Sequence, residues 1–142
     1  MASTPPNLMA NGNISPACFV KLDTGNDDYA LQATAGSGSH GDPTIGISSE
    51  STDQPPLSDL ITTFYHAIAG EPVRLYGAGD ICSLVAGAAI STERRLKSDA
   101  NGNGIPVTSD GDFIGAIALE TCSGSGQKVK VQVVSPAQMA AA

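Results

Sequence analysis

The chain has no tryptophan, and only 4% of its 142 residues are aromatic. Its core must therefore be built from Val, Ile, Leu and Ala, and an adhesin that stacks sugars on exposed rings has few rings to use. No apolar run approaches the roughly eighteen residues of a membrane span, and the N-terminus lacks the basic-then-apolar pattern of a signal peptide. We expect no membrane partner and synthesis in a cytoplasm.

Basic residues are also scarce. Seven Lys and Arg stand against fourteen Asp and Glu, which gives a net charge of −7, and only Arg94 and Arg95 are adjacent. A nucleic-acid ligand needs clustered cations to neutralise its phosphates. The composition therefore predicts no nucleic-acid partner.

The cysteines Cys18, Cys82 and Cys122 are few, odd in number and far apart. An odd set without a signal peptide favours reduced thiols. A metal site needs ligands paired at short spacing, and neither His40 nor His66 supplies a second ligand beside a cysteine. We expect no metal and no cofactor.

A nucleophilic serine is not indicated by any motif. The segments 36–39 (GSGS) and 124–126 (GSG) are linker-like and differ from the strand-to-helix elbow that exposes a catalytic serine. His40 follows a small-residue loop and His66 lies on an apolar segment, which is more typical of surface or packed histidines than of a base. The sequence predicts no enzyme and no catalytic residue.

Residues 99–104 (DANGNG) match the start of a calcium loop, and Asp110 falls at position 12. However, position 9 is Val107, an aspartate replaces the bidentate glutamate poorly, and the flanking segments are predicted to be strands. A hairpin turn whose Asn-Gly steps adopt positive φ explains the same residues. We expect a turn that does not bind calcium.

Glycine and proline are abundant, at 16 and 9 residues, and they divide the chain into short apolar clusters. Such spacing is typical of an all-β barrel or sandwich. Strands are predicted over residues 17–22, 29–34 and 44–48, in one β-rich domain spanning residues 14–142. Residues 57–69 combine helical spacing of apolar positions with β-forming residue types, so helix and strand both stay open there.

A partial internal repeat organises the chain. Residues 14–15, 20–23, 41–46 and 50 recur in the same order as residues 90–91, 96–99, 111–115 and 120. A strand, a polar turn, a second strand and a Gly-Asp turn before an Ile-Gly strand thus occur twice, unless the similarity is a coincidence within a β-rich chain.

Residues 1–13 form the polar N-terminal segment, with Pro5-Pro6 and several asparagines that prevent a helix. Its apolar side chains are Leu8 and Met9. We expect an extended arm that is disordered in the free protein and binds a partner by strand addition through Pro5, Pro6, Asn7, Leu8 and Met9.

A series of short segments lies in order along most of the chain: residues 16–23 (PACFVKLD), 30–33 (ALQA), 45–48 (IGIS), 70–77 (GEPVRLYG), 96–102 (LKSDANG), 114–120 (IGAIALE) and 129–133 (VKVQV). This order resembles the capsid decoration proteins of tailed bacteriophages, also called cement or head-stabilising proteins. The resemblance implies a small β-barrel or β-tulip-like domain. Residues 57–69 have no counterpart in that family.

The resemblance also implies a structural virion protein on the outer surface of the capsid. Its partners would be the major capsid protein, whose neighbouring subunits it clamps to stabilise the expanded head, and further copies of itself, often as a trimer. The alternative is a cytoplasmic barrel-sandwich carrier of the biotinyl or lipoyl kind, or a small binding or adhesin module. A carrier needs a lysine at a hairpin tip, whereas Lys21, Lys97, Lys128 and Lys130 lie in predicted strands or beside a turn.

Overall fold

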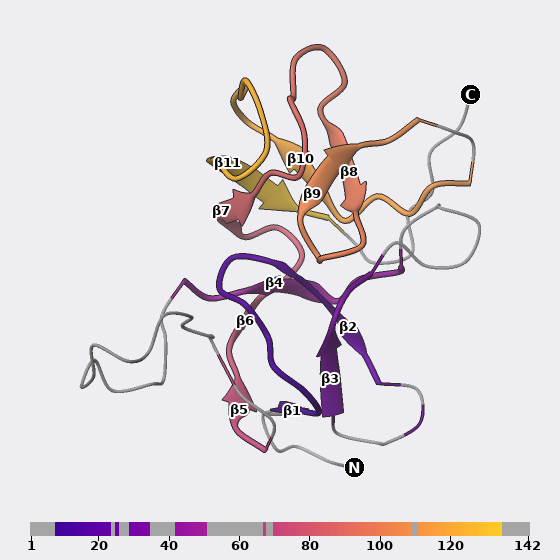
Figure 1. Cartoon of the computed structure of the whole chain (residues 1–142), viewed down its shortest axis with the longest axis vertical. Helices are drawn as coiled ribbons and strands as arrows, with labels where there is room; N and C mark the ends of the chain where they lie inside the picture. The colour runs from indigo at the N-terminus through magenta and orange to yellow at the C-terminus, as the bar shows by residue number, and fades with distance from the viewer. Residues whose placement is uncertain are drawn as a thin grey trace.

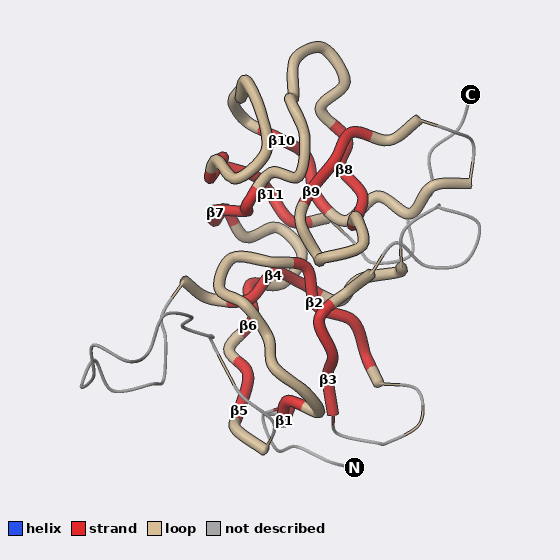
Figure 2. Tube along the Cα trace, viewed as in Figure 1, coloured by secondary structure: helices blue, strands red, loops and turns tan. Residues whose placement is uncertain are grey.

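The computed structural model describes residues 8–23, 25, 29–34, 42–50, 67, 70–108 and 111–134. Within these residues the chain forms strands, turns and loops and no helix (Figure 2). The strands are β1 (Leu8–Ala10), β2 (Phe19–Leu22), β3 (Tyr29–Gln32), β4 (Gly46–Ser48), β5 (Pro72–Val73), β6 (Leu75–Tyr76), β7 (Ile81–Val85), β8 (Arg95–Ser98), β9 (Gly104–Pro106), β10 (Ala116–Ala118) and β11 (Lys128–Val133). The predicted all-β class of short strands is confirmed.

The first sheet has six strands in the order β5-β1-β3-β2-β4-β6 and is nearly closed into a barrel (Figure 1). Its edge strands β5 and β6 are separated in the sequence by Arg74 alone. Both edge strands therefore come from one short segment, so the sheet has to curve until its two edges lie close together. The interior is filled by small and branched side chains, namely Ala10, Ile14, Val20, Ala30, Ala67 and Val73.

The second sheet has five strands in the order β7-β11-β10-β8-β9. A parallel bridge between Ala86, which follows β7, and Gly104 in β9 joins its two ends into a second barrel. A Cβ atom at Gly104 would lie 2.5 Å from Leu84 Cδ2, so glycine is needed for this close approach. The core includes Leu84, Ile90, Leu96, Val129 and Val131.

The two barrels share one architecture. Each of four backbone pairs in the first barrel has an equivalent pair in the second. Leu8–Val73 corresponds to Leu84–Val129, Met9–Pro72 to Val85–Lys128, Ala10–Ala30 to Ala86–Gly104, and Ile14–Ala67 to Ile90–Cys122. Gly70 and Gly126 also correspond, since they have φ angles of 89° and 87° and donate 2.8 Å hydrogen bonds to the carbonyls of Ala10 and Ala86. The single segment β11 corresponds to both β5 and β6.

The predicted internal repeat is therefore confirmed, and it extends further toward the N-terminus than predicted because it includes β1. In the segment before β4, the predicted alignment of residues 41–46 with residues 111–115 is shifted by one residue. Ile45 corresponds to Gly115 and not to Ile114, since the N–H groups of Ile45 and Gly115 donate to the carbonyls of Val20 and Leu96 at 2.9 Å each.

The N-terminal segment differs from the expected free arm from Leu8 onward. β1 pairs in parallel with β3 and antiparallel with β5, Ala10 is fully buried, and Leu8 packs against the first core. The expectation that Leu8 and Met9 have no partners in their own domain is wrong, because β1 completes the first barrel. Pro5, Pro6 and Asn7 lie outside the described residues, as does most of the segment 57–69.

Candidate functional site: the barrel junction and an open face

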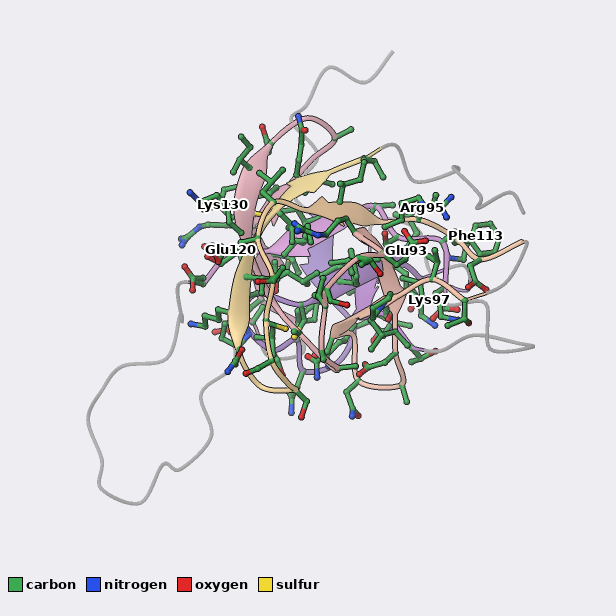
Figure 3. All side chains as sticks on the ribbon, turned by 90° about the horizontal axis from the view of Figure 1, so that it is seen from above. Glu93, Arg95, Lys97, Phe113, Glu120 and Lys130 are labelled. Carbon is green, nitrogen blue, oxygen red and sulfur yellow. The ribbon has the colours of Figure 1, made fainter. Side chains whose placement is uncertain are left out.

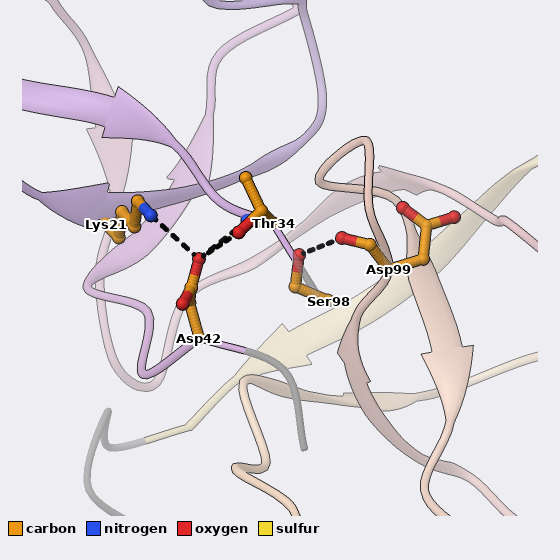
Figure 4. A network of polar contacts seen from close by, with 5 residues as sticks. All are labelled: Lys21, Thr34, Asp42, Ser98 and Asp99. Carbon is orange, nitrogen blue, oxygen red and sulfur yellow. Dashed lines mark hydrogen bonds and ion pairs between the residues drawn. The ribbon is translucent and has the colours of Figure 1, made fainter. Parts of the chain in front are cut away.

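A polar triad of Lys, Asp and Thr occurs once in each barrel. In the first barrel, Asp42 Oδ2 accepts hydrogen bonds from Lys21 Nζ at 2.9 Å and from the N–H and hydroxyl of Thr34 at 2.8 Å each (Figure 4). Partial burial alone would raise the pKa of Asp42, but these hydrogen bonds and the charge of Lys21 lower it below its usual value. This aspartate is held ionised and is unsuited to act as a general base.

The second barrel repeats the arrangement at greater depth. Lys97 Nζ lies 3.1 Å from Asp112 Oδ2, with the two side chains 7% and 0% exposed. The N–H of Thr108 donates to the same oxygen at 2.8 Å, and the hydroxyl oxygen of Thr108 accepts a hydrogen bond from Lys97 Nζ at 3.3 Å. Each triad links a lysine on β2 or β8 to the loop before β4 or β10, so both serve the fold of their barrel.

The predicted hairpin between β8 and β9 is confirmed. Asp99 Oδ1 accepts the N–H groups of Asn101 and Asn103 at 2.8 and 2.9 Å, and Gly102 has a φ of 79°. The oxygen expected at position 1 of a calcium loop therefore closes an Asx-type turn with its own backbone. Asp110 lies outside the described residues, so the absence of calcium binding stays a prediction.

The cysteines are all free in the structure. Burial, and secondarily Asp99, raises the pKa of Cys18 to about 11, and burial followed by Asp80 and Glu50 raises that of Cys82 to about 11. These two thiols are protonated at neutral pH and are poor nucleophiles.

Across the described ranges no cluster of three metal-ligating side chains occurs and no helix is long and apolar enough to cross a membrane. His40 and His66 lie outside those ranges.

The two barrels meet where the outer side of the first, formed by β2 and β4, packs on the β8–β9 turn of the second. The N–H of Phe19 donates to the carbonyl of Gly102 at 2.8 Å, and the N–H of Val85 donates to that of Ala17 at 2.9 Å. The ring of Phe19 lies directly over Gly115, because a Cβ atom there would be 2.6 Å from Phe19 Cε1. Phe19 consequently belongs to the core of the second barrel.

A cleft of about 510 Å³ opens beside this junction. It is lined from the first barrel by Ser15, Pro16, Cys18 and Gln32, and from the second by Val85, Asn101, Asn103 and Lys128. Its size is that of a small-molecule site. However, its one charged lining residue, Lys128, forms a 2.8 Å ion pair with Glu50 across the junction. The lining therefore presents no pair of groups arranged for acid–base catalysis.

The second barrel carries most of the large apolar side chains that the described residues expose. We define its open face as Ile81, Arg95, Ile117, Leu119 and Gln132. Gln132 pairs with Ile81 on one side and with Ile117 on the other, and Ile117 pairs with Arg95, so four of these residues form a row across β7, β11, β10 and β8. Ile81, Leu119 and Ile117 are 58%, 44% and 36% exposed. This open face, which combines three exposed apolar side chains with Arg95 and Gln132, is the candidate binding surface, and sequence analysis did not identify it.

Arg95, at one end of the open face, is held in a fixed geometry by Glu93. Glu93 accepts two hydrogen bonds from the Arg95 side chain, at 2.9 Å from Nε and 2.8 Å from Nη2. These bonds lower the pKa of Glu93 to about 2 and raise that of Arg95. Viewed from above, this pair and the residues Glu120 and Lys130 lie on opposite sides of the molecule (Figure 3). The open face therefore has residues of charged type at both ends.

No protein-family model and no curated protein matches the chain. Among solved structures, the fold is similar to the crystal structure of the head fiber gp8.5 N base of bacteriophage phi29, with a TM-score of 0.53 and 18% sequence identity. The similarity covers 95% of this chain and 96% of the phi29 chain. The likeness therefore concerns the whole two-barrel fold.

Proposed function

We propose that the protein is a structural component of a bacteriophage virion, which binds the outer surface of the capsid and clamps neighbouring major capsid protein subunits of the expanded head. The observation that carries this proposal is the likeness, over nearly the whole of both chains, to the base of a phage head fiber. It agrees with the resemblance of the sequence to decoration proteins. The proposed partners are the major capsid protein and further copies of the chain, as a trimer.

The chemistry of the described residues supports a binding role. Asp42 and Asp112 are ion-paired, and the thiols of Cys18 and Cys82 are protonated. These four groups are therefore poorly suited to act as an acid, a base or a nucleophile. A protein of this kind works by binding free energy, because a ligand that binds only the intact shell stabilises it by mass action.

The junction between the barrels suits a clamp. Two backbone hydrogen bonds, the Lys128–Glu50 ion pair and the Phe19–Gly115 contact hold the barrels together. When one barrel docks on the shell, the other is presented to a neighbouring subunit at high effective concentration. A rigid connection also limits the conformational entropy lost on binding.

The lysines give no support to the carrier alternative. Lys21 and Lys97 are ion-paired with aspartates, and Lys128 and Lys130 lie within β11. A carrier lysine has to stand at an accessible hairpin tip. None of these four positions is a hairpin tip.

Binding to purified expanded heads tests the proposal. Heads are mixed with protein, pelleted, and assayed for bound protein and for resistance to thermal disruption. We expect saturable binding that raises the disruption temperature of the heads. Failure to bind expanded heads of the phage that encodes the chain would contradict the proposal.

The N-terminal residues before β1 form a separate part of the same proposal. Deleting residues 2–7 removes Pro5, Pro6 and Asn7 but leaves β1 and the first barrel complete. If these residues add a strand to the shell protein, the deletion should weaken head binding by about a hundredfold when several arms act together, with unchanged folding. Unchanged affinity would place all shell contacts on the barrels.

A further inference from the structure

The contact between the barrels is heterologous, since it joins two different surfaces. The first barrel contributes its outer side, which includes Phe19 and Ile47. The second contributes its turn end, which includes Ser98, Gly102 and Val85. Both barrels have the same architecture, so each possesses both surfaces. Among the residues that the structure describes, one outer side, on the second barrel, and one turn end, on the first, are therefore left uncovered.

The uncovered outer side is the open face. Phe19 and Ile47 are both 0% exposed beneath the second barrel, whereas their counterparts Arg95 and Ile117 are at the surface, with Ile117 36% exposed. The isoleucine is thus the same residue type in both copies, but it has a covering layer in only one. Ile81, on the other side of Gln132 from Ile117, adds a second exposed isoleucine to the open face, with 58% exposure.

Among the described residues, the uncovered turn end is represented by Leu22, at the end of β2. Its counterpart Ser98 is 1% exposed. Leu22 is 51% exposed. An exposed apolar side chain therefore occupies the position whose counterpart in the other barrel is covered. Each free surface thus carries at least one large exposed apolar residue, namely Leu22 on the turn end and Ile81, Ile117 and Leu119 on the open face.

Charge is distributed unequally between the halves of the chain. Residues 1–77 contain two basic and eight acidic residues, whereas residues 78–142 contain five basic and six acidic residues. Arg95 lies in the open face and Lys130 borders it (Figure 3). Residues 78–142 are thus nearly neutral, and the charge of Arg95 is balanced by Glu93 at 2.8 Å. The open face therefore carries little net charge that would repel the acidic first barrel of a second copy.

We propose that the open face of the second barrel binds the turn end of the first barrel of a second copy, so that copies join head to tail. This deepens the proposed function, since it names the surfaces on which copies of the clamp meet. The contact differs in detail from the one within the chain. Within the chain, the ring of Phe19 packs over Gly115. In the contact between copies, the equivalent residues are Arg95 and Ile45, so an arginine stands where the ring is inserted. The contact between copies is therefore more polar, and we expect it to be reversible.

Sedimentation velocity on the full chain, without heads, tests this contact at about 1–100 µM. Ile117→Arg disrupts the open face, and Leu22→Glu disrupts the turn end. Tyr76→Glu is the matched control, because Tyr76 is 38% exposed but lies in neither surface. Circular dichroism and thermal melting of each variant establish that it folds.

We expect the wild type and Tyr76→Glu to associate, and each of the other two variants to associate at least tenfold more weakly. An equimolar mixture of Ile117→Arg and Leu22→Glu should form a two-chain species, since each variant retains the surface that the other lacks. A monomeric wild type, association that survives Ile117→Arg, or a mixture that stays monomeric would each overturn the proposal. If Ile117→Arg associates normally but loses binding to heads, the open face contacts the shell, which also overturns it. Because association is measured without heads, a failure of head binding by the wild type leaves this result unaffected.

Discussion

The contact between Phe19 and Gly115 allows a sharp test of how the barrels are joined. A methyl group at residue 115 would lie 2.6 Å from Phe19 Cε1, 3.0 Å from Phe19 Cζ and 2.7 Å from Thr44 Oγ1. Carbon atoms in contact are normally about 3.5–4.0 Å apart. The ring and the threonine must therefore move by nearly 1 Å, and both are almost fully buried.

Overpacking of this kind costs about 1–3 kcal/mol. We expect Gly115→Ala to lower the free energy of unfolding by this amount and the Tm by about 3–10 °C. Gly124→Ala in the same barrel is the control, because a Cβ there has no atom within 4 Å, and its unfolding midpoint in urea should be unchanged or slightly raised.

A double-mutant cycle assigns the effect to the ring. Phe19→Leu removes the atoms nearest to the added methyl, so Gly115→Ala should be at least about 0.5 kcal/mol less costly in the Phe19→Leu protein than in the wild type. Part of the cost should persist, since Thr44 is unchanged. The reasoning is refuted if Gly115→Ala is neutral, or if its cost is the same with and without the ring.

Three further outcomes are expected. Lys97→Met removes the cation that pairs with the buried Asp112 and should lower the free energy of unfolding, measured in urea, by about 3–5 kcal/mol. Lys21→Met acts on a partly exposed ion pair and should lower it by less than half as much. Equal losses in the two variants would contradict the difference in burial between the two ion pairs. Because folding lowers the pKa of Asp42, its stabilisation is present above its unfolded pKa and is lost as pH falls through the folded value. Asp42→Asn should therefore lose less stability than the wild type in acid melts below about pH 4, and parallel losses would refute this. Melting curves in millimolar calcium and in chelator should coincide, because the Asp99 carboxylate is occupied by its own turn; a rise of several degrees with calcium would show a cation site.

The sequence predicts the class of the fold because its signals are local. Glycine, proline and asparagine divide the chain into short β-forming segments, and the predicted strands contain β2, β3 and β4 with slightly wider bounds. The turn after β8 follows from Asp99 and the Asn-Gly steps that come after it. The repeat is also visible in the sequence, since the Lys and Asp of each triad recur in the same order.

The role of β1 is not visible in the sequence. β1 has three residues, which are too few to show an alternation of apolar and polar positions. In addition, the pairing of β1 with β3 and β5 joins residues that are far apart in the chain. The candidate binding surface is likewise hidden. Ile47 and Ile117 are the same residue type in equivalent strands, so no local rule distinguishes the one that is covered from the one that is open.

The sequence by itself determined an all-β chain of two related halves, with reduced cysteines and few cations. Only the tertiary structure decided that each half closes into a barrel, that Phe19 enters the core of the other barrel over Gly115, and that one outer side and one turn end stay uncovered. The physical reason is that turn and strand preferences depend on neighbouring residues, whereas burial depends on which surface of a distant segment packs against them.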